Sequence, residues 1–282
     1  MNELKFEDIV KEEMEGQRGV NFPVKASFAE RVMIKNISPF RLHPNPDDEF
    51  CDEKIGPSFR IISEYVEKIK IALRKDEPVL DEPVIIQKLY PRDYIIINGH
   101  HRWAAAIRLG VKKIPVRIVN FASEKQVKKL LSDSANDKRV VFDLDEVIFR
   151  PADDPYLEKP LHFPFNIRIN NRIRLGVPAL FHYFEKEGYD IWLYSAGYYS
   201  YDDIEIFFRH YKAHIEGAIT GTAKKNNMRK RMEKLLSDKY VSTLHIDNET
   251  VLLAKNDPQE FAIKGNSGEW SREIMDIMKG LK

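Results

Sequence analysis

Apolar residues recur at helical spacing in one segment of the first half of the chain and form short runs in others. Residues 59–75 repeat them at three- and four-residue steps, which is typical of an amphipathic helix. Those positions are Ile62, Tyr65, Val66, Ile69 and Leu73. Apolar runs bounded by turn residues predict strands over 82–89, 93–99 and 114–120, and a helix over 100–110. The Pro-rich segment 42–58 cannot form a regular helix or a central strand.

In the second half, strand patterns and helix patterns alternate. Strands are expected over 140–149, 189–197, 214–221 and 242–248, and helices over 177–188, 202–214 and 224–236. Alternation of this kind predicts right-handed crossovers and a parallel, doubly wound sheet. Ligands of such sheets bind beyond the carboxyl ends of the strands, so the residues that follow each strand deserve most weight.

We expect two domains, because 282 residues exceed the usual size of one. The polar run 132–139 predicts a boundary between residues 1–137 and 138–282.

The amino-acid composition adds few limits on the function. With 45 basic and 44 acidic residues the net charge is +1, which argues neither for nor against a nucleic-acid partner. Cys51 is the sole cysteine, which excludes an internal disulfide and a thiolate zinc cage. The charged N-terminus and the lack of a long apolar run predict a cytoplasmic protein with no membrane partner.

Polar residues follow three of the expected strands in the second half. Asp143 and Asp145 end the first, Ser195 ends the second, and Asp247 and Asn248 end the last. If these strands are parallel neighbours, the side chains gather at one edge. Clustered carboxylates favour a magnesium ion. A carboxylate can act as a nucleophile toward phosphorus, and a hydroxyl and a lysine, here Lys224 or Lys225, can hold the phosphoryl oxygens.

The segment DLDEV (143–147), Ser195, the lysine pair and Asp247 resemble, in order, the four motifs of the haloacid dehalogenase (HAD) superfamily over about residues 138–282. The resemblance implies a capless phosphatase with an aspartyl-phosphate intermediate. It implies that Asp143 is the nucleophile and Asp145 the general acid and base. It implies that Ser195 and a lysine hold phosphate, with Mg²⁺ at Asp143, Asp145, Asp247 and Asn248. The short spacing between motifs predicts a bulky substrate, such as a polynucleotide end or another large phosphoester.

A second candidate site lies in the first half, at NGHHR (98–102). A glycine at the end of a strand lets the backbone approach a ligand closely, and the amides at the start of the following helix attract phosphate. Three alanines, 104–106, allow that helix to pack closely. The pattern therefore predicts a phosphate cradle without a P-loop.

NGHHR resembles the ParB/sulfiredoxin superfamily over about residues 34–121, and within it the free-serine kinases, which carry Asp-Gly-His-His-Arg. The resemblance implies that Asn98, Gly99, His100, His101 and Arg102 bind a nucleotide, with ATP, ADP and CTP as the alternatives. If this domain is a kinase, Glu49 of the acidic turn 47–49 is the expected base. Asn98 replaces the aspartate of the kinases, and Asn cannot act as a base.

Two interpretations of the whole chain remain open at this stage. In the first, the protein is a bifunctional phosphoryl-transfer enzyme, chiefly a phosphatase, whose first domain binds a nucleotide or also acts as a kinase. In the second, it is a nucleotide- or nucleic-acid-binding regulatory protein with a non-catalytic HAD scaffold. The fold class expected in both is mixed, α/β and α+β.

Overall fold

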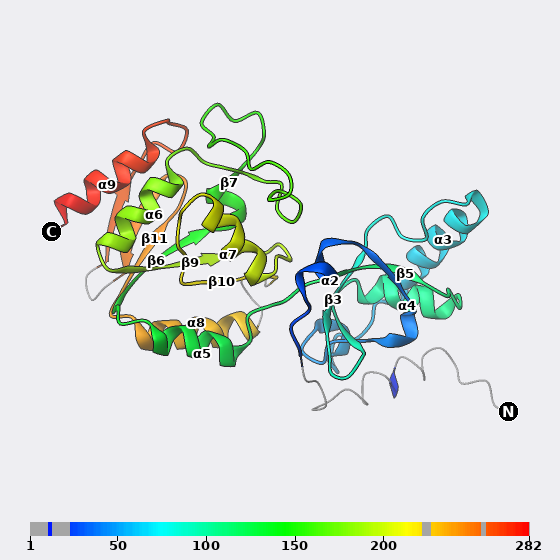
Figure 1. The fold of residues 1–282 in the computed structure, drawn as a ribbon. Coiled ribbons are helices and arrows are strands. Elements are labelled where there is room, and N and C mark those ends of the chain that lie inside the picture. Colours follow the sequence, from blue (N-terminus) through cyan, green and yellow to red (C-terminus); the bar gives the residue numbers. More distant parts are fainter. Residues whose placement is uncertain (1–10, 13–22, 222–226, 255–257, 282) are drawn as a thin grey trace. The chain divides into compact units, whose positions relative to one another are not determined.

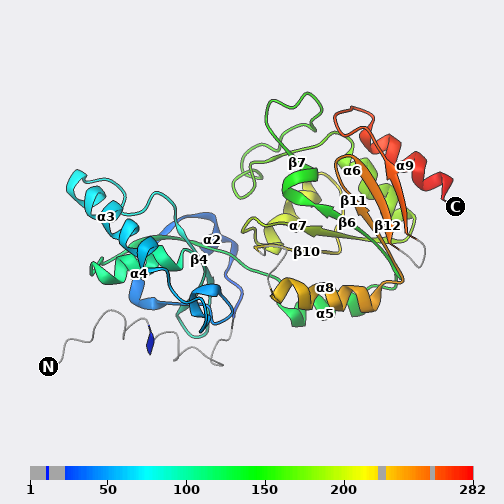
Figure 2. The ribbon, with the colours of Figure 1, turned by 180° about the vertical axis from the view of Figure 1, so that it is seen from behind.

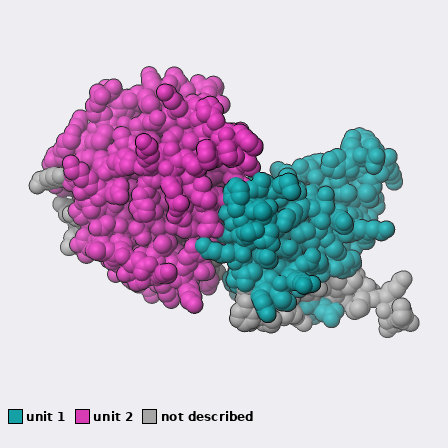
Figure 3. All heavy atoms as spheres, in the orientation of Figure 1, with its two compact units in different colours: residues 1–120 teal, residues 121–282 magenta. Residues whose placement is uncertain are grey.

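The computed structural model describes residues 11–12, 23–221, 227–254 and 258–281. The chain divides into two compact units, residues 1–120 and residues 121–282 (Figure 3). Within the described part of the chain, no helix is both long enough and apolar enough to cross a membrane.

The first unit is built on a five-stranded mixed sheet with the order β1-β5-β3-β4-β2 (Figure 1). Its elements are α2 (Phe28–Val32), β1 (Lys35–Ile37), η1 (Pro39–Arg41), β2 (Leu42–His43), η2 (Glu49–Cys51), α3 (Phe59–Lys75), β3 (Val84–Lys88), β4 (Tyr94–Asn98), α4 (His100–Arg108) and β5 (Ile114–Ile118). Strand β2 is parallel to β4, and β3 is antiparallel to it. The end of β2, the end of β4 and the start of β3 therefore lie at one edge of the sheet.

Helices α3 and α4 pack against each other and complete the core of the first unit. Helix α3 begins where the side chain of Ser58 accepts a hydrogen bond from the amide of Ile61. Ile62, Val66 and Ile69 of the predicted apolar face are buried, whereas Leu73 is exposed. Trp103 of α4 is buried, and its indole N–H donates to the carbonyl of Pro39 at 2.9 Å. These contacts fix the start of α4 at the strand edge.

The second unit has a six-stranded sheet with the order β10-β9-β6-β11-β12-β13. Its elements are α5 (Glu124–Asp133), β6 (Lys138–Asp143), η3 (Leu144–Ile148), β7 (Phe149–Arg150), β8 (Arg172–Ile173), α6 (Val177–Lys186), β9 (Tyr189–Tyr194), α7 (Tyr201–His210), β10 (Gly217–Ile219), α8 (Asn227–Lys239), β11 (Ser242–Ile246), β12 (Thr250–Ala254), β13 (Gln259–Ala262) and α9 (Trp270–Gly280). The first four strands of the order are parallel, and the last two pairings are antiparallel.

Alternate residues of the central strands face opposite sides of this sheet. Val140 and Phe142 join the core formed with α6, α7 and α9, whereas Val141 and Trp192 join the core formed with α5 and α8. Figure 2 shows α5 and α8 side by side on one face and α6 and α9 on the other. The predicted alternation of parallel strands and helices is confirmed for this half of the chain.

Five elements of the second unit, α5, β8, β12, β13 and α9, were not predicted from the sequence. Helix α5 explains why the units divide at residues 120 and 121 rather than at 137 and 138. Its Val127 and Leu131 pack into one cluster with Met232 and Leu236 of α8. The strand expected over 140–149 ends at Asp143 and gives way to the π-helical turn η3, because the Asp143 carboxylate caps that turn.

Gly217 lies opposite Trp192 on the neighbouring strand, and a Cβ there would come within 2.3 Å of the indole ring. We predict that Gly217→Ala lowers the free energy of unfolding by about 1–3 kcal/mol, because the buried indole has no room to move. Urea unfolding of the full chain measures it. Gly280→Ala, where a Cβ meets nothing within 4 Å, is the matched control and should cost nothing. Equal losses in both variants would contradict the packing argument.

Candidate functional site

Helix α4 begins at a glycine that has no capping side chain. Gly99 is the N-cap residue, with φ 99° in the left-handed region, and no side chain caps this end among the described residues. The first backbone bond of the helix runs from the amide of Trp103 to the carbonyl of Gly99 at 2.9 Å. The amides of residues 100–102 precede that bond, so they are the donors that a helix N-terminus offers to an anion.

The guanidinium of Arg102 fills the space beside Gly99. A Cβ at Gly99 would lie 3.0 Å from Nε and 3.1 Å from one Nη of Arg102. The side chain is buried, and its Nη2 donates to Oδ1 of Asn98 at 2.7 Å. Its Nη1 donates to both the carbonyl and the carboxylate of Glu82 at 3.1 Å. Asn98 therefore orients the arginine through its side-chain oxygen. This role needs an acceptor but no carboxylate, so asparagine can replace the aspartate that the resemblance leads one to expect at this position.

His100 and His101 hold the two ends of the loop 45–58. The amide of Asn45 donates to Nε2 of His100, and the amide of Ser58 donates to Nε2 of His101, both at 3.1 Å. An accepting Nε2 requires a neutral ring with its proton on Nδ1, and Nδ1 of His100 lies 3.5 Å from Oδ1 of Asp48. His100 is thus buried and engaged through both nitrogens, which makes it a support for the loop.

Burial keeps both imidazole rings neutral. It lowers the pKa of His100 from 6.5 to about 4; Asp48 opposes this shift, and His101 adds to it. The pKa of His101 is also lowered, chiefly by burial. The neutral form is the one that can accept the two loop amides, so the hydrogen bonds and the low pKa values agree.

The loop held by these histidines carries the expected base. The buried ring of Phe50 stacks on His100 with centroids 5.3 Å apart and meets His101 edge-on at 5.2 Å. Asp48 accepts a hydrogen bond from the amide of Phe50 at 2.9 Å and so caps the short helix η2. Glu49, between them, is exposed. Of these two acids, Asp48 is committed to the turn and Glu49 faces solvent.

A cavity of about 180 Å³ borders Arg102. Its walls come from α3 through Tyr65, Lys68 and Ala72, from the segment 79–82, and from the arginine itself. Asp81 and Glu82 add carboxylates to this lining. The cavity therefore has apolar walls and charged groups of both signs.

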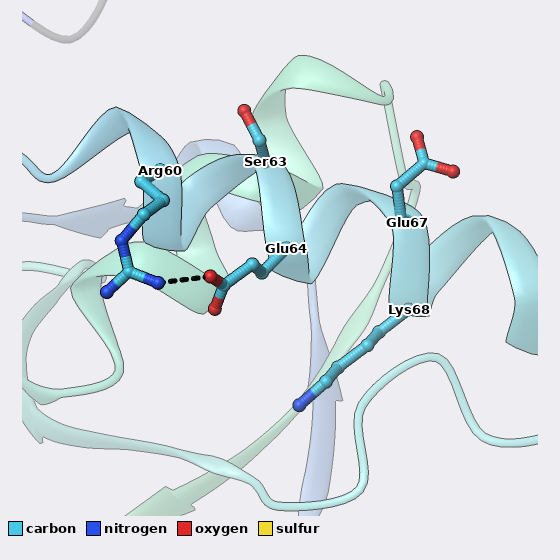
Figure 4. Close-up of a pocket in the computed structure, with 5 residues that line it drawn as sticks. All are labelled: Arg60, Ser63, Glu64, Glu67 and Lys68. Carbon is cyan, nitrogen blue, oxygen red and sulfur yellow. Dashed lines mark hydrogen bonds and ion pairs between the residues drawn. The ribbon is translucent and has the colours of Figure 1, made fainter.

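A second hollow lies on the exposed side of α3 (Figure 4). All five residues that line it, Arg60, Ser63, Glu64, Glu67 and Lys68, belong to this one helix. Arg60 and Glu64 form an ion pair there. A surface formed by a single helix, on which Arg60 is already paired with Glu64, is a poor candidate for a ligand site.

In the second unit the polar residues predicted at strand ends do lie at one edge. Strands β9, β6 and β11 are parallel neighbours, with Asp143 opposite Tyr194 and Phe142 opposite Ile246. Oδ2 of Asp145 accepts hydrogen bonds from Ser195 Oγ at 2.6 Å and from the amides of Ala196 and Gly197 at 3.0 and 3.3 Å. Three donors thus converge on one carboxylate oxygen.

The expected magnesium ligands do not form a metal site within the described residues, where no three His, Cys, Asp or Glu side chains could hold a metal ion. Oδ1 of Asn248, its one metal-binding atom, instead accepts from Arg174 at 2.8 Å and lies 3.5 Å from Nη1 of Arg150. Lys224 and Lys225 fall outside the described residues.

Comparisons with known proteins support one of the two resemblances. Residues 29–135 match the ParB N-terminal domain. The chain is 32% identical over 94 residues to an ATP-dependent L-serine kinase of Staphylothermus marinus, covering 33% of this chain and 34% of that protein. An ATP-dependent L-serine kinase of Desulfurococcus mucosus is 36% identical over 64 residues, covering 22% and 23%. The chain therefore spans about a third or less of the length of these relatives.

A solved free serine kinase in complex with AMP aligns with 93% of this chain and 86% of its own, at 14% identity and a TM-score of 0.24. A likeness this weak carries no argument. The support for a ParB/free-serine-kinase-like domain rests on the sequence matches.

These matches correct the main activity expected from the sequence. The prediction that the enzyme is a phosphatase is wrong, because the curated relatives carry the name of a kinase. The comparisons also do not support the resemblance of residues 138–282 to the HAD superfamily, which stays a prediction. Asp143, Asp145 and Ser195 carry that resemblance, and their place at parallel strand ends is common to many doubly wound sheets.

Sequence reasoning missed several residues that shape both sites. Glu82, Phe50 and Ser58 contact the NGHHR segment, and Arg150 and Arg174 contact Asn248. Each of these partners lies at least 20 positions away from the residue it contacts. No local pattern joins them, so only the folded chain shows the contacts.

We predict that acidification destabilises the protein through His100. The unfolded ring binds a proton near pH 6.5 and the folded one only near pH 4, so stability is full above about pH 6.5 and falls as the pH drops toward 4. The expected slope in this window is about 1.4 kcal/mol per pH unit at most, for one proton. Urea unfolding at several pH values measures it.

His100→Gln removes the titrating ring and should flatten this part of the profile. His182→Gln, at an exposed position on α6, is the control and should leave the profile unchanged. An unaltered slope in His100→Gln would show that other groups cause the acid sensitivity.

Proposed function

We propose that the first unit binds ATP and transfers its terminal phosphoryl group to the hydroxyl of a small acceptor of the L-serine class. The observation that carries this proposal is the uncapped N-terminus of α4, where the amides of residues 100–102 follow Gly99 at a strand edge. It lies within the segment that matches the ParB N-terminal domain, and two relatives are named ATP-dependent L-serine kinases.

The phosphates of ATP lie against the amides of residues 100–102 in this proposal. The partial positive charge of a helix N-terminus favours them, and the donors are fixed before the reaction begins. Arg102 sets the shape of the cradle, since its guanidinium packs beside Gly99 and is held by Asn98 and Glu82. Of the three nucleotides ATP, ADP and CTP, we propose ATP, because both curated relatives are named ATP-dependent kinases.

Glu49 is the general base. Its carboxylate takes the proton from the acceptor hydroxyl as the oxygen attacks the γ-phosphorus. A new oxygen–phosphorus bond forms, the bond between the γ-phosphorus and the β,γ-bridging oxygen breaks, and ADP leaves with that oxygen. Phe50 holds the turn against both histidines, so the carboxylate is carried on a braced loop.

The cavity beside Arg102 fits the charge pattern of an amino acid. Its carboxylates, Asp81 and Glu82, suit an ammonium group, and Arg102 suits a carboxylate. At about 180 Å³ it holds roughly six waters by liquid volume, which is room for a molecule as small as serine. The ion pair between Arg102 and the exposed Glu82 is easily exchanged for one with a ligand.

We predict that Glu49→Gln lowers kcat for transfer of labelled phosphate from MgATP to L-serine by roughly 10²–10⁴-fold. The KM for ATP should change little, because Glu49 contacts the acceptor and not the nucleotide. Glu53→Gln, an exposed acid four positions later in the same loop, is the control and should retain full activity. If Glu49→Gln transfers phosphate as fast as the wild type, Glu49 is not the base. If the wild type itself transfers no phosphate to any small hydroxyl compound, the proposed kinase activity is overturned.

A further inference from the structure

Two arginines lie side by side in the second unit, next to Asn248. Arg150 ends strand β7, and Arg174 follows strand β8, which pairs with β7. Arg174 Nη2 donates to Oδ1 of Asn248 at 2.8 Å and to the carbonyl of Gly265 at 3.1 Å. Arg150 Nη2 donates to Oδ1 of Asn266 at 3.1 Å. The oxygens of Asn248, Gly265 and Asn266 that accept these hydrogen bonds are all neutral.

The pair has too little negative charge around it. Asp154 accepts from Nε of Arg150 at 2.7 Å, and no other described carboxylate forms an ion pair with either arginine. Arg174 is 3% exposed, and its Nη1 is buried without a hydrogen-bond partner among the described residues. A missing hydrogen bond on a buried charged group lowers the stability of the folded protein. The arrangement is therefore unfavourable as long as no ligand is bound to it.

Burial lowers the pKa of Arg174 to about 10; the neighbouring Arg150 adds to this shift, and Asp154 opposes it. The group is still charged at neutral pH, so the cluster keeps an excess positive charge. The guanidinium of Arg174 lies over the ring of Trp270, with Cζ 4.4 Å from the ring centroid, and this contact holds the guanidinium in place. Two rigid guanidinium groups that share a single carboxylate partner carry the excess charge and the donors that an oxyanion needs.

We propose that Arg150 and Arg174 form a binding site for an oxyanion of phosphate size, either free phosphate or the phosphoryl group of a small ester. The entrance is at Asn266, which is exposed and bonds to Arg150 through a side-chain oxygen that a ligand oxygen can replace. The bound anion accepts from Nη1 of Arg174 and Nη2 of Arg150. A buried water could satisfy the orphan nitrogen but would not neutralise the charge.

The site adjoins the carboxylate edge of the sheet through Asn248. This residue follows Asp247, and its Nδ2 donates to the carbonyl of Glu146 in the turn η3. An anion on the arginines would therefore lie near the turn that presents Asp143 and Asp145, without using either of them. The proposal does not depend on the kinase activity of the first unit.

The test is calorimetric titration of the full chain with inorganic phosphate and, separately, with phenyl phosphate, at constant ionic strength. The expected result is saturable binding that becomes weaker by about tenfold or more in Arg174→Gln, because a charge-assisted hydrogen bond is lost. Arg272→Gln, an exposed arginine paired with Glu269 on α9, is the control and should bind as the wild type does. Binding of phosphate but not of the ester identifies the free ion as the ligand.

Two more variants keep the test decisive if Arg174→Gln fails to fold. Asn266→Asp places a negative charge at the entrance and should weaken binding at an exposed position. Arg150→Gln should also weaken binding, because it removes the second guanidinium that donates to the anion. The proposal is overturned if neither ligand binds the wild type, or if Asn266→Asp and Arg150→Gln bind as tightly as it does.

Discussion

The close contact between Gly99 and the guanidinium of Arg102 is the constraint on which the first unit depends. A side chain at residue 99 would be strained at φ 99° and would press on the arginine at 3.0 Å. The glycine therefore does two things: it turns the chain from β4 into α4, and it lets the arginine pack against that turn.

The two histidines extend this constraint to the loop that carries Glu49. They occupy the first turn of α4, and each accepts a backbone amide from one end of the loop. Their rings are neutral because they are buried, and they can accept only while neutral. Nucleotide cradle and candidate base are thus parts of one hydrogen-bonded unit, whose residues are spread from position 45 to position 102.

Local patterns in the sequence were sufficient for some parts of this structure. Apolar spacing located α3, and the glycine before two histidines located the start of α4. The same approach placed Asp143 and Ser195 at one sheet edge, and the roles that it gave them there stay predictions. Local patterns could not find the bond of Arg174 to Asn248, because 74 positions separate the two residues. Ionic and hydrogen-bonded contacts of this range leave no periodic signal.

The most direct test of the central claim is the affinity for ATP of two glycine variants, Gly99→Ala and Gly110→Ala, measured by calorimetry. Both positions have positive φ, but a Cβ at Gly110 meets nothing within 4 Å, so this variant controls for backbone strain alone. The account predicts that Gly99→Ala weakens ATP binding by about tenfold or more, and that Gly110→Ala binds ATP as the wild type does. Equal affinity in Gly99→Ala and the wild type would contradict a nucleotide site at the start of α4.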